Sequence, residues 1–339
     1  MIGFIGRRLG QALLVLFGAS IMVFLLVRVL PGDPVDILAA EEGATAEQRA
    51  LLREQMGLDQ SLPVQYFDFI IAALRGDLGV SLTQRIPVSQ ALIEGLGATL
   101  QLTLAGMLVA IIIALPLALL SALKQNSIWD RLGTIGSMFG VSMPTFWQGI
   151  MLILIFSVAF HALPTGGIMG TGYNVPNVTY MPILDSMIAG NPAAVWSNIV
   201  HLTLPAITLG TSAAAMLTRL LRASLLEVKN QDFVDALRAR GISDWKVMMH
   251  MLRNALPTTV IVFGSKLGTL LGGTLVIEVV FSWPGLGALL VEAISGRDYP
   301  VVQGAVLVAT VMVVLCNLLA DLAQGWLDPR VQMAKAASA

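Results

Sequence analysis

The sequence predicts an all-α protein that crosses a membrane with six helices. Of its 339 residues, 56% are hydrophobic and only 12% are charged, whereas about a quarter of the residues in a soluble domain carry a charge. Uncharged runs recur along the chain, and they reach or exceed the roughly 20 apolar residues that a helix needs to cross a bilayer. Because only helices and closed barrels satisfy the backbone in lipid, we expect these runs to be helices.

The expected spans are separated by charged or loop-forming segments. They lie at about Leu9–Leu30, Gly95–Leu123, Leu132–Phe160, Asn198–Leu217, Leu256–Phe281 and Val301–Trp326. Glycines and prolines between Pro164 and Pro182 divide the longest uncharged stretch and predict a loop. Arg7 and Arg8 before the first run are typical of a signal peptide, but the run is too long for a cleaved one, so we expect a retained span.

The placement of lysine and arginine predicts the orientation, because these residues concentrate in cytoplasmic loops. With both termini in the cytoplasm, most of the 20 Lys and Arg residues fall on the inner side, and the outer loop from His161 to Ser197 has none. The chain then divides into a first span (1–30), an outer region (31–94) and a core with five spans (95–339).

Composition excludes several other classes of protein. The net charge of −1 offers no general basic surface to a nucleic acid. The single cysteine, Cys316, excludes a disulfide framework and a zinc site built on several thiolates. His161, His201 and His250 lie far apart without metal-ligand spacing. We therefore expect neither a metal site nor a catalytic site on this chain.

The outer region has helical signals of its own. Thr45 with Gln48 forms a capping box that begins a helix, and Gly57 ends it. A second helix, Val64–Leu74, is amphipathic and is followed by a turn at 75–77. The apolar residues on its one face are Phe67, Ile70, Ile71 and Leu74. Two compatible interpretations are open: helices lying on the membrane surface, and a docking face for an external partner.

The most informative segment, Arg219–Pro257, is the one long charged stretch on the inner side. It predicts a helix that continues beyond the membrane, a short helix that ends at Gly241, and a helix, Asp244–Asn254, that returns to the membrane. Glycine suits a helix C-terminus, and the arginines before it suit the negative end of the helix dipole.

Such a hairpin would present a short, rigid knob to the cytoplasm. Phe233, Val234 and Leu237 would enter a groove on a partner, while Arg238 and Arg240 would meet its acidic rim. From the physics alone, an ordinary solvated loop is the more frequent outcome for such a segment.

Asp235-Ala236-Leu237 followed by Gly241 resembles the E-A-A-x-x-x-G signature of ABC-importer permeases, with Asp for Glu and Leu for the second Ala. A more specific similarity to the B-type permease of dipeptide and oligopeptide importers extends over nearly the full chain. The matching residues are Pro31–Pro34, Gly57–Asp59, Gln65–Tyr66, Gly76–Gly79, Ser142–Pro144, Phe146–Trp147, Arg219, Arg222, Ser224, Leu226–Val228, Asp232–Phe233, Arg238–Gly241, His250, Leu252–Ala255, Phe281–Gly287, Arg297–Pro300 and Asp328–Arg330.

This resemblance implies a type I ABC-importer permease fold in the bacterial cytoplasmic (inner) membrane. A second, C-type permease would complete the pathway, two cytoplasmic ABC ATPases would bind the hairpins, and an extracytoplasmic peptide-binding protein would deliver the substrate. ATP and Mg would be bound by the ATPases, since this chain has no G-x-x-x-x-G-K-S/T loop. The residues implied for ATPase coupling are Asp232, Phe233, Asp235, Ala236, Leu237, Arg238, Arg240 and Gly241.

Lys266 and Glu278 interrupt the fifth span and are candidates for lining the pathway. A charge at the bilayer centre costs about 2.5 kcal/mol or more, so such groups face protein or water. They are roughly 18 Å apart along a helix, and each would meet one terminus of a zwitterionic peptide. The alternative is a structural ion pair with a neighbouring helix or with the partner permease, and for Asp321 near the inner end that alternative is favoured.

Two other functional classes fit less well. A secondary transporter or channel would be expected to show inverted repeats and buried coupling charges, but no internal repeat is evident. An intramembrane enzyme would need a nucleophile–base set or a metal cluster, which the sequence lacks. The substrate stays open among dipeptides, oligopeptides, glutathione, haem and nickel chelates, with selectivity expected largely in the delivering protein.

Overall fold

The structure, a computed structural model, describes residues 2–29, 45–55, 57–125, 127–128, 130–131, 136, 140, 142–265 and 267–327. Within these ranges the chain is helical, and β structure is limited to one isolated bridge between Val80 and Pro87. The elements in order are α1 (Ile2–Val29), α3 (Ala46–Gln55), α4 (Leu62–Leu74), α5 (Val88–Leu123), α7 (Thr145–Leu152), the π-helix η1 (Ile153–Ala159), α8 (Pro182–Ile188), α9 (Pro192–Lys229), α10 (Asp232–Ala239), α11 (Asp244–Ser265), α12 (Leu267–Val280), α13 (Leu286–Ser295) and α14 (Tyr299–Leu327).

Four of the described helices, α1, α5, α9 and α14, are long and apolar enough to cross a membrane. They correspond to the first, second, fourth and sixth expected spans, so the prediction of an all-α membrane protein is confirmed. Helix α9 runs past the expected end of its span at Leu217 to Lys229, as the charged segment after it predicted.

The third and fifth expected spans are not single helices in the described part of the chain. The third is represented by α7 and η1, which together are shorter than a span, and residues 132–135 before them lie outside the described ranges. The fifth consists of α11 and α12 on either side of Lys266, which is itself outside the described residues. The count of six therefore stays a prediction.

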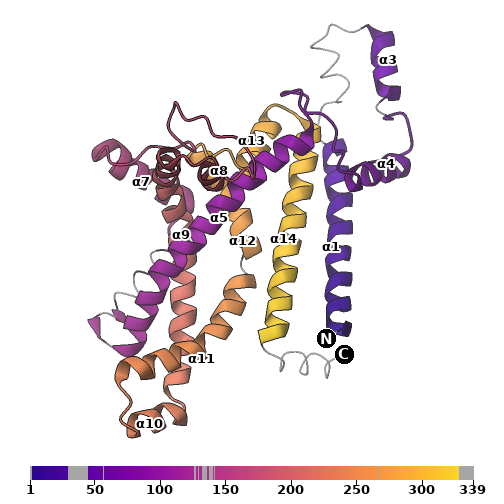
Figure 1. Ribbon diagram of the computed structural model, residues 1–339. Helices are drawn as coiled ribbons and strands as arrows, with labels where there is room; N and C mark the ends of the chain where they lie inside the picture. Colours follow the sequence, from indigo (N-terminus) through magenta and orange to yellow (C-terminus); the bar gives the residue numbers. More distant parts are fainter. Residues whose placement is uncertain are drawn as a thin grey trace.

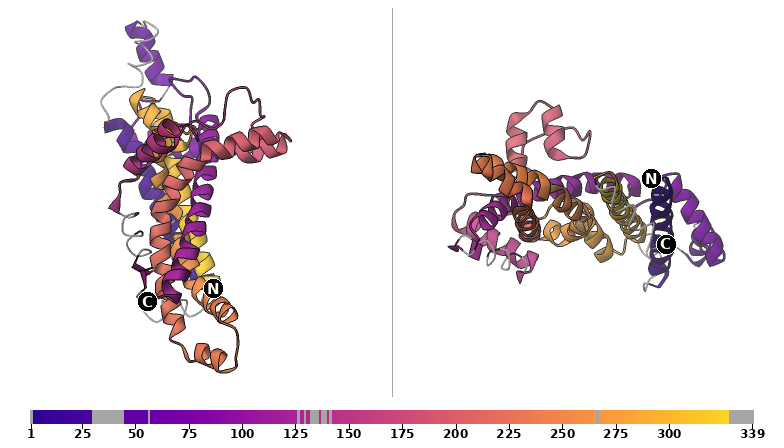
Figure 2. Two further views of the ribbon diagram at one scale, coloured as in Figure 1. Left: turned by 90° about the vertical axis from the view of Figure 1, so that its left-hand side faces the viewer. Right: turned by 90° about the horizontal axis from the view of Figure 1, so that it is seen from below.

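The long helices run between two opposite ends of the molecule (Figure 1). The hairpin that carries α10 lies at one end, together with the beginning of α1 and the end of α5. Helices α3, α4, α8 and α13 lie at the opposite end. Seen from below, α1 and α4 occupy one edge of the molecule (Figure 2).

Helices α5 and α9 form the central pair, and small residues permit their close approach. A Cβ atom on Gly106 would lie 2.7 Å from the Leu209 side chain, and one on Gly210 would lie 2.6 Å from the Gly106 carbonyl oxygen. Glycine and alanine let transmembrane helices approach until their backbones nearly touch, which increases dispersion contact. Alanines continue this contact, and Ala110 and Ala114 of α5 pack in one buried cluster with Ala213 and Ala214 of α9.

The outer region contains the two expected helices. The backbone N–H of Thr45 donates to Gln48 Oε1 at 2.8 Å, the hydroxyl of Thr45 accepts from the Gln48 N–H at 3.4 Å, and Gly57 follows α3 with a φ of 63°. The expected capping box and glycine stop are thus confirmed. Helix α4 begins one residue before Pro63, and Gly76 with a φ of 80° makes the turn after it.

Helix α4 is held against the second half of α1 by two adjacent residues, Gln65 and Tyr66. Gln65 Oε1 accepts from Arg28 Nη2 at 2.6 Å and from Nε at 3.1 Å, and the Tyr66 hydroxyl lies 2.8 Å from Ser20 Oγ. The Tyr66 ring meets Phe24 edge-on at 5.3 Å. Gln65 and Tyr66 belong to the family resemblance, and in this structure they attach α4 to α1.

A second attachment joins the segment before α5 to the start of α14. The buried carboxylate of Asp298 accepts from Ser81 Oγ at 2.5 Å and from the N–H and Oγ1 of Thr83 at 3.0 and 2.8 Å. Burial alone would raise the pKa of Asp298, but the hydrogen bonds from Ser81 and Thr83 outweigh it, so that this pKa lies below its usual value.

Candidate functional site

Helix α10 is a short helix between two long ones, and its C-terminus is closed by glycine. Gly241 has a φ of 71°, its N–H donates to the Arg238 carbonyl at 2.9 Å, and the N–H of Ile242 donates to the Leu237 carbonyl at 3.2 Å. These two bonds are the pair of a Schellman motif, which needs a residue in the left-handed conformation. The expected helix–Gly–helix hairpin is therefore confirmed.

The apolar side of α10 faces its own chain. Val234 has an exposed fraction of 0% and packs in a cluster with residues of α5, α9 and α11. Phe233 and Leu237 are half-buried against the same cluster. The prediction that Val234 enters a groove of a partner is thus wrong, because an amphipathic helix of eight residues buries its apolar stripe in the nearest core.

The outward side of α10 is polar. Asp232, Asp235, Ala236, Arg238 and Arg240 are all exposed. Arg238 Nη1 lies 3.8 Å from Asp235 Oδ1, and both side chains are so exposed that this pair adds little to stability. The acids stand in the first turn and Arg238 in the last, which suits the helix dipole. This side offers charges of both signs to a partner.

The cluster under α10 connects the hairpin to the end of α5. Its fully buried members include Ala118 and Ala122 of α5, Leu221 and Leu225 of α9, and Met251 of α11. The hairpin is therefore not a loose loop, because α10 packs against the ends of α5, α9 and α11.

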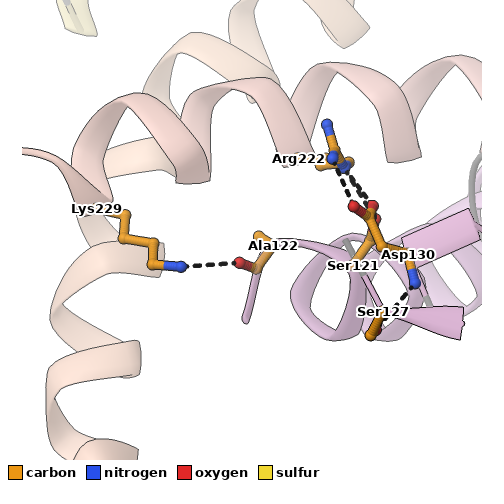
Figure 3. Close-up of polar contacts among 6 residues, drawn as sticks. All are labelled: Ser121, Ala122, Ser127, Asp130, Arg222 and Lys229. Atoms are coloured by element: carbon orange, nitrogen blue, oxygen red, sulfur yellow. Dashed lines mark hydrogen bonds and ion pairs between the residues drawn. The ribbon is translucent and has the colours of Figure 1, made fainter. Parts of the chain in front are cut away.

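A polar cluster lies beside this apolar one (Figure 3). The guanidinium of Arg222 on α9 binds the Asp130 carboxylate with two parallel bonds, Nε to Oδ1 at 2.8 Å and Nη2 to Oδ2 at 2.9 Å. Ser121 near the end of α5 donates its hydroxyl proton to Asp130 and accepts from Arg222 Nε at 2.9 Å. Lys229 Nζ lies 3.5 Å from the carbonyl oxygen of Ala122.

This polar cluster was not predicted from the sequence. Asp130 belongs to the short segment after α5, and Arg222 lies far along the chain on α9. The available signal was an acidic residue in a short segment that otherwise carries basic residues, but its partner is identified only by the packing of α5 on α9.

Glu278 is fully buried with an exposed fraction of 0%. Its Oε2 accepts from the N–H groups of Gly287 and Ala288 at 2.7 and 3.0 Å, and its Oε1 accepts from the Thr99 hydroxyl at 2.7 Å. The carboxylate thus caps the positive end of α13, where free N–H groups and the helix dipole favour an anion. This geometry favours a structural role for Glu278, through hydrogen bonds and not through the ion pair considered above.

The run Phe281–Gly287 is built around this carboxylate. A Cβ atom on Gly285 would lie 2.3 Å from Glu278 Cδ, so any larger residue there would displace the carboxylate. Trp283 is fully buried, and its indole N–H donates to the Ala98 carbonyl of α5 at 2.9 Å. These residues of the family resemblance therefore join α12, α13 and α5 at the end of the molecule opposite the hairpin.

Lys266 and Asp321 are the remaining charged residues that were considered for the fifth and sixth spans. Lys266 lies outside the described residues, so its role in the pathway stays a prediction. Asp321 of α14 forms an ion pair with Arg8 of α1 at 2.8 Å, which confirms the structural alternative favoured for it.

Family models and curated relatives match nearly the whole chain. The family model described as binding-protein-dependent transport system inner membrane component matches residues 114–333, and the N-terminal model of the same system matches residues 1–103. The Dipeptide transport system permease protein DppB of Escherichia coli (strain K12) is 39% identical over 99% of this chain and 100% of its own length. The Di/tripeptide transport system permease protein DppB of Pseudomonas aeruginosa (strain UCBPP-PA14) is 39% identical over 98% and 99%. A solved chain described as an amino acid ABC transporter covers 70% of this chain and 94% of its own length, with a TM-score of 0.47 and 16% identity.

Proposed function

Because this chain belongs to the B-type peptide permeases of ABC importers, transport subunits without an ATPase site of their own, we propose that it forms a pathway for dipeptides or short peptides together with a second, C-type permease. Two cytoplasmic ATPases drive the transport, and an extracytoplasmic peptide-binding protein supplies the substrate. The observation that carries the proposal is the hairpin, whose polar outward face is exposed while its apolar face is anchored on three helices.

The proposed topology has six spans with both termini in the cytoplasm of a bacterium. It is supported by the arrangement in Figure 1, in which the start of α1 and the α10 hairpin lie at one end. The loop between η1 and α8, which has neither Lys nor Arg, belongs to the other end with α8. The four described spans and the family together make the chain a multi-pass membrane protein.

In the proposed mechanism the hairpin transmits the motion of the ATPases. Asp232, Asp235, Arg238 and Arg240 contact the ATPase surface, while Phe233 and Leu237 hold α10 to the cluster beneath it. Closure of the two ATPases on ATP carries both hairpins together and reopens the helices toward the outside. The peptide-binding protein then releases its cargo into the cavity between the two permeases, and hydrolysis returns them.

Peptides are the proposed substrate class because the two most informative relatives are named for dipeptide and di/tripeptide transport. In this structure Glu278 is fully buried and engaged at both oxygens as a helix cap, which argues against a contact with the ammonium group of a peptide. Lys266 stays the proposed pathway residue on this chain.

Co-purification tests the proposal. The chain is expressed with a C-type permease and two ATPases, and a tag on this chain is used to recover the complex. Reversing both charges, with Arg238→Glu and Arg240→Glu, should reduce recovery of the ATPases severalfold. The matched control is Arg253→Glu, because Arg253 is also exposed but lies on α11, farther from α10.

If the unaltered chain recovers no ATPase, or drives peptide uptake without one, the proposed function is wrong. If the double reversal recovers the ATPases as well as the control does, the assignment of the polar face of α10 as their contact is wrong.

A further inference from the structure

Two kinds of contact join the cytoplasmic end of α5 to the hairpin. The first is apolar, because Val234 of α10 packs in the same buried cluster as Ala118 and Ala122 of α5. The second is polar, because Arg222 of α9 holds Asp130, which follows α5, and Ser121, which is part of it. Helix α5 is not part of the hairpin, and at this end of the molecule these contacts add to its close packing along α9 and join it to the hairpin.

The polar contact between Arg222 and Asp130 is well suited to fixing the position of the end of α5 relative to α9. Its two parallel bonds define the distance and the angle between the guanidinium and the carboxylate, as a single bond or an apolar contact does not. The side chains are 29% and 8% exposed for Arg222 and Asp130, so water screens the pair only in part. Ser121 lies within hydrogen-bond distance of both, and it ties α5 itself to the pair (Figure 3).

Stability alone is a weak reason for such a pair. Removing two charges from water carries a desolvation penalty, and well-packed apolar residues of similar volume often serve a fold equally well. A bidentate pair defines one arrangement of its elements, and it connects α9, directly before the hairpin, to the segment that follows α5.

We infer that Arg222 and Asp130, with Ser121, are positioning residues that make the end of α5 and the segment after it move with the hairpin. The inference rests on the proposed function, because it concerns how movement of the ATPases reaches α5. Helix α10, and not α5, makes the proposed contact with the ATPases. When the pair is intact, α5, α9 and α10 move as one body. When it is broken, the hairpin still binds the ATPases but moves α5 less completely.

The test uses the complete importer in proteoliposomes, with peptide uptake and ATP hydrolysis measured in the same sample. Arg222→Ala and Asp130→Asn should lower the peptide taken up per ATP hydrolysed by between about twofold and thirtyfold, the range seen for residues that transmit coupling. The amount of assembled complex and its ATP hydrolysis without the binding protein should stay unchanged.

Three further variants separate positioning from general support of the fold. Arg222→Lys keeps the charge but loses the bidentate fork, so it should give an intermediate ratio. The exchange of both residues, Arg222→Asp with Asp130→Arg, should recover part of the loss. Arg219→Ala is the matched control, because Arg219 lies on the same helix one turn earlier and is exposed, and it should leave the ratio unchanged.

The inference is overturned if both single variants keep the uptake per ATP of the unaltered importer. It is also overturned if the exchange is no better than the worse of the two single variants. Should Arg222→Ala prevent assembly, the nearly isosteric Asp130→Asn decides the question. Failure of the proposed function is seen with the unaltered chain, whereas failure of this inference is seen only in the variants, so the two are distinguishable.

Discussion

Replacing Glu278 by alanine removes the acceptor of three hydrogen bonds at the start of α13. Two of the donors are the backbone N–H groups of Gly287 and Ala288, and the third is the Thr99 hydroxyl. A buried N–H group left without a partner costs about 1–3 kcal/mol, and the lost hydroxyl bond adds about 1 kcal/mol. We therefore expect a loss of about 3–7 kcal/mol in the free energy of unfolding, which is a large part of the ~5–15 kcal/mol of a typical protein.

Glu278→Gln provides the matched comparison, because its amide oxygen still accepts from both N–H groups while its NH₂ group faces Thr99. The expected loss is about 1.5–3 kcal/mol, the share of one hydrogen bond to a charged group. The purified proteins are heated in detergent, and the folded fraction that remains is measured by size-exclusion chromatography. The unaltered protein should be the most stable, the glutamine variant less stable and the alanine variant the least stable. Equal stability of the alanine variant would refute the assignment of Glu278 as a helix cap. A glutamine variant with unaltered stability but impaired peptide uptake would instead support a role in the pathway.

Three other outcomes follow from the contacts. Val234→Asp should unfold the hairpin and abolish ATPase recovery, because it buries an unpaired carboxylate in the cluster beneath α10, whereas Ala236→Asp on the exposed side of the same helix should leave folding intact. Gly285→Ala should destabilise by about 1–3 kcal/mol, the range for overpacking, since its Cβ would collide with Glu278, while Gly76→Ala meets no atom within 4 Å and should lose only the smaller amount due to its positive φ. The lowered pKa of Asp298 means that its stabilising contribution is complete above about pH 4, the unfolded value, and is lost as the pH falls from there through the folded pKa; thermal unfolding of Asp298→Asn should therefore vary less over this acid range than that of the unaltered protein.

Local signals predicted much of the fold. The capping box of Thr45 and Gln48, the glycine stop at Gly241 and the amphipathic helix after Pro63 are interactions between near neighbours in sequence, and the structure confirms them. The faces of the short helices were harder to predict. Val234 was expected to point outward, because its apolar character does not say whether a partner or its own chain will cover it.

Among the charged residues, too, some structural roles could be predicted from the sequence and others could not. Asp321 was assigned to a structural pair, and the structure supplies Arg8 as its partner. The partners of Glu278 and Arg222 were not predicted, because they lie on distant segments that only the packing of α5 brings together with α12, α13 and α9.

The sequence by itself determined that this is a multi-pass helical membrane protein with one charged hairpin, and its motifs identified the family. Apolar runs, caps and glycine stops depend on residues within a turn or two of each other, so composition and spacing are sufficient to detect them. The tertiary structure decided which way the hairpin faces, that Glu278 caps α13, and that Arg222 holds Asp130. Each of these depends on a donor and an acceptor, or two apolar surfaces, that are far apart in sequence, and only the packed helices place them within contact distance.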